Sequence, residues 1–213
     1  IVGFSGLLVE PSTDEEERKE YSSIIRNNTD LMLNLVNDVL DLSRMETGDL
    51  HFDIKDHLLL VCCQMALESV RHRIPDGVKL TFSPAGEPIV VHVDNLRLQQ
   101  LLTNLLTNAA KFTEKGEINL SFQLEPDRKK VCIAVTDTGA GIPLEKQATI
   151  FNRFEKLDDY KPGVGLGLSI CLLIAERLDG ALFIDSSYTD GARFVLILSC
   201  EIDSSIYNPP IEV

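Results

Sequence analysis

The sequence has no hydrophobic run that approaches the ~20 residues of a membrane-spanning helix. The apolar start, residues 1–9, lacks the basic flank and the cleavage pattern of a secretion signal. We therefore expect no membrane contact by this chain. Because it opens with Ile in the middle of an apolar pattern, we also expect it to be part of a longer protein.

Cysteine is scarce, and the spacing of the cysteines does not match that of a metal site. The chain has five cysteines, an odd number, and no Cys-x-x-Cys pair. Cys62 and Cys63 are adjacent, which suits neither a disulfide framework nor a zinc site. These features favour a reducing environment, and we expect a cytoplasmic location.

Basic residues are too few for a protein that binds phosphate polymers. Twenty Lys and Arg stand against 33 Asp and Glu, which gives a net charge of −13. Such a surface repels nucleic acid and anionic lipid, so we expect no nucleic-acid partner. The 213 residues, 44% of them hydrophobic, suffice for one domain with a sizeable core plus an appendage.

Residues 1–50 have the pattern of a helical hairpin. An apolar stripe over residues 1–9 stops before Pro11. A second helix is predicted to begin at Ser12 or Thr13, because each is followed three residues later by a Glu, as in a capping box. This helix is predicted to end near Gly48.

The second helix carries positions, apolar except for Asn28, that alternate spacings of three and four residues, as in the seam of a coiled coil. These positions are Ile25, Asn28, Met32, Leu35, Val39 and Leu42. A hairpin buries such a seam poorly alone, so pairing with a second copy into a four-helix bundle is expected. Packing onto the chain's own globular domain is the alternative.

From residue 51 the pattern becomes mixed α/β, and we expect a domain over 51–200 followed by a linker or tail over 201–213. Helices are predicted at 58–70, 96–111, 143–154 and 166–178, and strands at 78–82, 89–93, 118–124, 131–135, 181–185 and 192–199. The strands 118–124 and 131–135 alternate cleanly around a turn, which indicates a hairpin.

Three local patterns carry candidate chemistry. Asn104, Asn108 and Lys111 share one helical face, where amide oxygens suit Mg²⁺ and a lysine suits phosphate, although a solvated surface helix looks the same. Asp137–Gly141 places an acid at a strand end, suited to a purine amine or to a plain turn. Gly163–Leu168 precedes a helix and suits phosphate, although it matches neither the Walker nor the Rossmann pattern.

Taken together and in this order, the patterns resemble those of a known family. Asn104–Phe112, Asp137–Gly141, Phe151–Phe154 and Gly163–Leu168 resemble the N, G1, F and G2 boxes of sensor histidine kinases, particularly hybrid ones. Residues 41–48 resemble the end of that family's second dimerisation helix. The resemblance implies an α+β fold, in which a two-layer α/β sandwich of the histidine kinase and gyrase type follows the helical hairpin. It also implies Mg²⁺ and ATP bound beneath a mobile lid near residues 155–164.

The resemblance also implies roles for single residues. Asn108 would ligate Mg²⁺ with Asn104 in support, and Lys111 would meet phosphate oxygens. Asp137 would accept a hydrogen bond from the adenine amine, Phe112 would lie near the purine, and Gly139 and Gly141 would leave room for the base. Gly163, Gly165, Gly167 and Leu168 would form the lid and its phosphate contacts, and Arg153 would neutralise γ-phosphate charge.

Two departures from the family pattern stand out. Arg193 follows Gly191 and Ala192 where the family often has Thr or Ser, so a hydroxyl contact is not expected there. The phosphoacceptor motif, His-Glu followed by Arg-Thr-Pro-Leu, is absent. His51, His57, His72 and His92 all lack that context and are expected to be ordinary surface or packing residues. The chain is therefore not expected to phosphorylate itself at the family site.

The implied activity is that of a protein-histidine kinase, which transfers the γ-phosphoryl of ATP to a histidine and then to a response-regulator receiver aspartate. We expect the intact parent to be a homodimer and this chain a weak dimer or a monomer. Two alternatives remain: a non-catalytic nucleotide-sensing or dimerisation module, and a clamp ATPase. Clamp ATPases carry a Glu four residues before the Mg²⁺-binding Asn, whereas this chain has Asn104 there, which cannot accept a proton at neutral pH. A related kinase that phosphorylates serine would share the boxes but not the hairpin.

Overall fold

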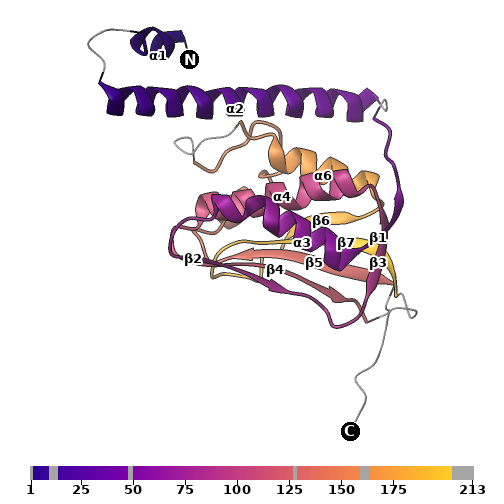
Figure 1. The fold of residues 1–213 in the computed structure, drawn as a ribbon. Helices are drawn as coiled ribbons and strands as arrows, with labels where there is room; N and C mark the ends of the chain where they lie inside the picture. The colour runs from indigo at the N-terminus through magenta and orange to yellow at the C-terminus, as the bar shows by residue number, and fades with distance from the viewer. Residues whose placement is uncertain (1, 10–13, 48–49, 127–128, 159–163, 203–213) are drawn as a thin grey trace. The chain divides into compact units, whose positions relative to one another are not determined.

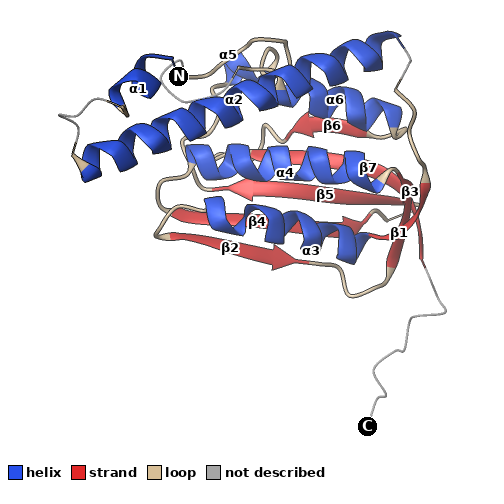
Figure 2. Cartoon of the chain, turned by 45° about the horizontal axis from the view of Figure 1, so that its top comes forward, coloured by secondary structure: helices blue, strands red, loops and turns tan. Residues whose placement is uncertain are grey.

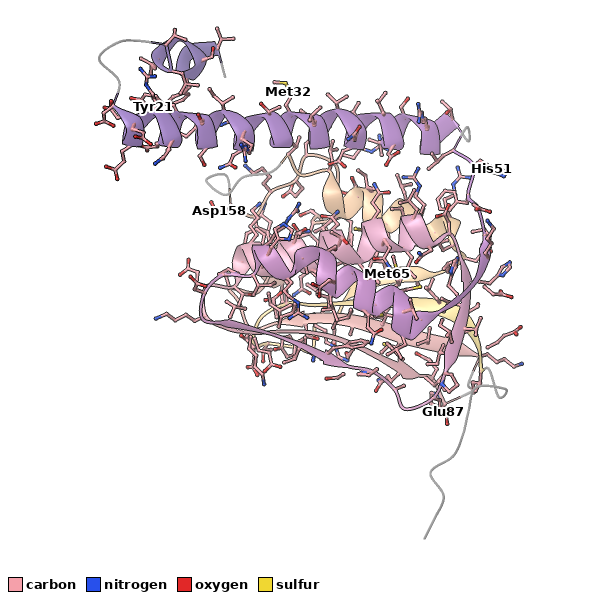
Figure 3. The ribbon with its side chains drawn as sticks, viewed as in Figure 1. Tyr21, Met32, His51, Met65, Glu87 and Asp158 are labelled. Atoms are coloured by element: carbon pink, nitrogen blue, oxygen red, sulfur yellow. The ribbon has the colours of Figure 1, made fainter. Side chains whose placement is uncertain are left out.

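The structure is a computed structural model that describes residues 2–9, 14–47, 50–126, 129–158 and 164–202. The backbone contacts divide the chain into two units, Ile1–Leu50 and His51–Val213, and Figure 3 labels His51 where the second unit begins. Among the described residues, none of the helices is both long and apolar enough to cross a membrane.

The first unit consists of α1 (Val2–Leu7) and α2 (Glu15–Thr47). Asp14 caps α2, because its Oδ1 accepts from the backbone N of Glu17 at 2.8 Å while its own backbone N donates to the Glu17 carboxylate at 3.0 Å. This capping box replaces the predicted ones, since Ser12 and Thr13 lie outside the described residues and the structure places the cap at Asp14. The Phe4 and Tyr21 rings join the two helices, with centroids 5.5 Å apart.

The second unit is built on a mixed sheet of seven strands in the order β1-β3-β7-β5-β4-β2, with β6 paired to β7. The strands are β1 (Lys55–Leu58), β2 (Val78–Ser83), β3 (Ile89–Val93), β4 (Gly116–Leu124), β5 (Lys130–Asp137), β6 (Ala181–Ile184) and β7 (Arg193–Ile202). Only β2 and β4 run parallel among these pairs. The predicted hairpin is the antiparallel pair β4–β5.

Three helices, α3 (Leu59–Val70), α4 (Asn95–Phe112) and α6 (Gly167–Arg177), cover one face of this sheet (Figures 1 and 2). The alternation of β4 and β5 turns their apolar residues toward the helices, which bury them. The core contains Leu98, Leu102, Leu105, Ile118, Leu120, Ile133, Ile174 and Leu196, all almost fully buried. This two-layer α+β architecture agrees with the expected fold class.

The structure contains one strand that was not expected from the sequence, and several helices and strands begin or end at other residues than expected. β1 was not predicted, because its residues alternate poorly and become a strand only by pairing with β3. The helix expected over 143–154 is only α5 (Leu144–Gln147), followed by turns. β7 continues to Ile202, two residues into the expected tail, because its last residues pair with β3. The rest of that tail, 203–213, lies outside the described residues.

Candidate nucleotide site

The helix α4 carries the first group of candidate residues and is fixed at its start by Asp94. This buried carboxylate accepts from the backbone N of Arg97 at 3.1 Å through Oδ1 and from that of Asp53 at 3.0 Å through Oδ2. Farther along α4, the leucine side of the helix is buried while Asn104, Asn108 and Lys111 remain half-buried on the other side. The predicted shared face therefore exists and is accessible to a ligand.

Asp137 is the last residue of β5, and the two oxygens of its buried carboxylate differ in their hydrogen bonds. Its side chain is only 4% exposed. Oδ1 accepts from the backbone N of Gly139 at 2.9 Å and from that of Ala192 at 3.3 Å. Oδ2 accepts no hydrogen bond within the described part of the chain. One oxygen is thus held by the backbone, and the other is available to accept from a ligand amine.

Burial raises the pKa of Asp137 above its ordinary value, and the hydrogen bonds from Gly139 and Ala192 oppose that rise. Folding therefore disfavours the ionised form of this carboxylate. As a result, the free energy of unfolding decreases as the pH rises from the pKa that Asp137 has in the unfolded chain to its higher pKa in the folded chain. A protonated Oδ2 can donate and no longer acts only as an acceptor.

We predict that binding of an adenine nucleoside weakens as the pH falls through the raised pKa of Asp137, because protonation removes the acceptor for the exocyclic amine. The measurement is a calorimetric titration with adenosine, which has no phosphate to titrate, at a series of pH values. The affinity should begin to fall at a higher pH than it would if Asp137 had the pKa of an ordinary aspartate. A profile that stays flat down to the ordinary Asp range would contradict this role.

Gly139 brings the turn after β5 against the end of α4. A Cβ at Gly139 would collide with the carbonyl O of Phe112 and would lie 2.9 Å from Oδ1 of Asp137. The backbone N of Ala140 donates to that same Phe112 carbonyl at 3.2 Å. The Lys111 Nζ lies 4.9 Å from the centroid of the Phe112 ring. The N-box and G1-box residues are therefore in direct contact.

The turn before β7 completes the surroundings of Asp137. A Cβ at Gly191 would collide with the Asp137 carbonyl O, and the Gly191 carbonyl would be 3.1 Å from a Cβ on Gly141, whose φ is +70°. Ala192 contributes only its backbone N–H, a role that any residue with an N–H can fill. The glycine just before the predicted strand 192–199 was the available signal, but nothing in the neighbouring sequence linked it to Asp137.

Arg193 does not take the place of a hydroxyl contact at this site. It pairs with Thr136 across the strands, one position away from Asp137, so its side chain leaves the sheet on the other face. Its Nη1 lies 3.6 Å from the Asp185 carboxylate. Arg193 is thus engaged with the β6–β7 turn and not with Asp137.

The start of α6 packs against the N-box face. A Cβ at Gly167 would be 2.5 Å from Nδ2 and 2.7 Å from Oδ1 of Asn104, so only glycine leaves room for that amide. No side chain caps the first turn of α6, which leaves backbone N–H groups at a positive helix terminus. Leu168 lies in that first turn. This arrangement suits a phosphate.

The F box and the base of the lid lie together. Phe151 packs edge-on against Phe194 of β7, with centroids 6.2 Å apart. The backbone N of Phe154 donates to the Gly165 carbonyl at 2.8 Å, and both residues have positive φ values, 63° and 79°. Arg153, one residue earlier, is exposed. Gly163 lies outside the described residues, whose last member before that gap is Asp158, labelled in Figure 3.

None of the four histidines lies among these residues. His92 pairs with Asp56 across β1 and β3, with 2.7 Å between Nδ1 and Oδ1, and both side chains are largely exposed. His51 and His72 are exposed, and His57 is half-buried. Within the described residues, no cluster of three or more His, Cys, Asp or Glu side chains could hold a metal ion. Any Mg²⁺ here would depend on amide oxygens and on phosphate.

Comparison with known proteins identifies the family. Residues 93–202 match the family described as "Histidine kinase-, DNA gyrase B-, and HSP90-like ATPase", and residues 1–48 match the "His Kinase A (phospho-acceptor) domain". The chain is 31% identical to "Hybrid signal transduction histidine kinase A" of Dictyostelium discoideum, over 93% of this chain and 10% of that protein. It is also 31% identical to "Autoinducer 2 sensor kinase/phosphatase LuxQ" of Vibrio vulnificus, over 100% of this chain and 26% of that protein.

The fold is similar to that of a solved histidine kinase. The crystal structure of full-length ShkA in complex with AMPPNP matches 92% of this chain and 42% of that chain, with a TM-score of 0.77 and 27% identity. The chain spans only 10% to 26% of the length of the first curated relatives that it matches. These comparisons support the histidine kinase interpretation rather than a clamp ATPase or a non-catalytic module. The chain belongs to the sensor histidine kinases and carries their ATP-binding domain together with a phosphoacceptor-domain region.

Proposed function

We propose that this chain binds ATP with Mg²⁺ and presents the γ-phosphoryl group to a histidine that lies outside these 213 residues. The observation that carries the proposal is the single available oxygen of Asp137, buried beside the accessible amide and lysine face of α4. An adenine amine at Oδ2 would direct the phosphates of the same nucleotide along that face. Family membership supports the same assignment.

The proposed adenine contacts use the end of β5 and the end of α4. Oδ2 of Asp137 accepts from the exocyclic amine, and Phe112 lies near the purine ring. Gly139 lies too close to the Phe112 carbonyl for any side chain at position 139. The base would thus be recognised by one directional hydrogen bond within mostly apolar surroundings, as is usual in sites that bind small molecules.

The proposed phosphate contacts use α4 and the start of α6. Asn108 would hold Mg²⁺, with Asn104 in support, and the donor set fits, because Mg²⁺ prefers oxygen ligands and usually takes only one or two from protein. When bound, the ion would neutralise charge on the phosphates. Lys111 would meet phosphate oxygens and Arg153 would meet the γ-phosphoryl group, while the uncapped N–H groups of Gly167 and Leu168 add positive potential.

The chemistry asked of these residues is positioning and charge stabilisation. Phosphoryl transfer needs little covalent help from the protein, so holding the γ-phosphoryl group in line with an incoming imidazole nitrogen supplies most of the effect. We propose that the phosphohistidine then passes the group to a receiver-domain aspartate of a response regulator. We also propose that the intact parent acts as a homodimer through its helical hairpin.

The test is a calorimetric titration of the chain with ADP and with a non-hydrolysable ATP analogue, each with Mg²⁺ and carried to millimolar nucleotide. Saturable binding of both is expected. Absence of binding at the highest concentration would refute the ATP site and favour a degenerate structural module.

Asn108→Ala is predicted to reduce the gain in ADP affinity that Mg²⁺ provides by about tenfold, because it removes the proposed protein ligand. Affinity in EDTA should stay unchanged, since the adenine contacts are intact. Asn95→Ala is the matched control, because it alters the same residue type at the other end of the same helix. An equal loss with and without Mg²⁺ would argue against metal ligation by Asn108.

A further inference from the structure

We propose that Cys171 is a positioning residue that fixes the orientation of the Asn104 amide, so that its nitrogen faces α6 and its oxygen remains available to the nucleotide site. This inference rests on the proposed function of Asn104. It concerns a residue of α6 that the sequence analysis did not single out.

Cys171 is buried on α6, between two groups of α4. Its Sγ lies 3.7 Å from the carbonyl O of Leu101, to which the thiol donates. The Asn104 Nδ2 lies 3.3 Å from the same sulfur and donates to it. A thiol has one hydrogen, and when this hydrogen points to Leu101 the sulfur can only accept from Asn104. The pair of contacts therefore distinguishes the two ends of the amide.

The Asn104 amide is held closely against the start of α6. The amide lies against Gly167, where a Cβ would be within 2.7 Å of Oδ1 and 2.5 Å of Nδ2. A flipped amide would place its oxygen against the sulfur, and the thiol would have to turn its hydrogen away from the Leu101 carbonyl to meet that oxygen. In the observed orientation the Asn104 N–H donates to the sulfur while the thiol donates to the Leu101 carbonyl.

This arrangement would explain how an amide supports a metal ligand on the next turn of the same helix. Asn108 lies four residues after Asn104, so the two side chains share a face of α4. Of the two ends of an amide, only the oxygen can accept a hydrogen bond from a metal-bound water or ligate Mg²⁺. By holding Nδ2, Cys171 ensures that the side chain presents an acceptor, and it does so without contacting the nucleotide.

The test compares Cys171→Ala and Cys171→Val, which remove the acceptor, with Cys171→Ser, which keeps one. Cys171→Val fills most of the volume, so it separates the acceptor from the cavity if the alanine variant folds poorly. Cys63→Ala is the matched control, because Cys63 is a fully buried thiol on α3. The first readout is the NMR signal of the Asn104 side-chain amide in the nucleotide-free chain.

The acceptor-free variants are expected to shift that amide signal and to reduce the Mg²⁺-dependent gain in ADP affinity by about threefold to tenfold. Cys171→Ser and Cys63→Ala should retain both. In an Asn104→Ala background, Cys171→Val should have no further effect on the Mg²⁺-dependent gain, because its action runs through Asn104.

An unchanged amide signal in Cys171→Val, or an equal loss of ADP affinity in EDTA, would overturn the inference. The failure of the proposed function looks different. In that case the unaltered chain would not bind ADP at all, while the amide signal, recorded without nucleotide, would still show whether Cys171 holds Asn104.

Discussion

Asp137→Asn is expected to weaken ADP binding by about 100-fold or more, because it places a donor where the adenine amine needs an acceptor. Oδ1 already accepts from the backbone N–H groups of Gly139 and Ala192. The amide oxygen of an asparagine would take that position, and its NH₂ group would occupy the place of Oδ2. Two donors would then face each other in a buried site.

The same geometry predicts a reversal of base preference, which a general loss of structure would not produce. Inosine diphosphate carries an acceptor in place of the exocyclic amine, so the unaltered chain should prefer ADP and Asp137→Asn should prefer the inosine nucleotide. Calorimetry with both nucleotides measures the ratio. Asp179→Asn, which alters an exposed residue with a φ of 53°, is the control that should leave the ratio unchanged.

Folding of the Asp137→Asn chain should not be impaired. Because burial raises the pKa of Asp137, keeping this carboxylate ionised in the folded chain costs stability, and a neutral amide of similar size removes that cost. Thermal unfolding should therefore show a melting temperature no lower than that of the unaltered chain. Weak ADP binding with a lower melting temperature and no change in base preference would count against the adenine contact.

Gly139→Ala is expected to lower both the stability of the second unit and its affinity for nucleotide. The new Cβ would collide with the Phe112 carbonyl, a backbone atom that cannot turn away, and would press on Oδ1 of Asp137. Overpacking of this kind costs ~1–3 kcal/mol of unfolding free energy. The displaced carboxylate should weaken ADP binding by at least about tenfold.

Urea unfolding measures the first effect and calorimetry the second. Gly86→Ala is the matched control, since a Cβ at Gly86 meets nothing within 4 Å and its φ is not in the left-handed region. That substitution should leave both quantities near those of the unaltered chain. If Gly139→Ala behaved like Gly86→Ala, the close approach of the G1 turn to α4 would not be a requirement of the site.

The sequence was sufficient for those features that depend on neighbours within a few residues. The shared face of Asn104, Asn108 and Lys111 follows from helical spacing alone. The hairpin of β4 and β5 follows from alternation around a turn. The sequence pattern was a weaker guide to β1, which becomes a strand by pairing with β3. It was also a weaker guide to the start of α2, which was predicted at Ser12 or Thr13 and is capped by Asp14.

The tertiary structure decided the arrangements that join distant parts of the chain. Ala192 meets Asp137 from 55 residues away, and Cys171 meets Asn104 from 67 residues away. Alanine and cysteine carry no distinctive pattern, and their roles here depend on strand register and on helix packing. The sequence therefore determined which chemical groups this kinase domain has, whereas long-range packing decided which oxygen of Asp137 and which end of Asn104 remain available, because orientation depends on partners that only folding brings together.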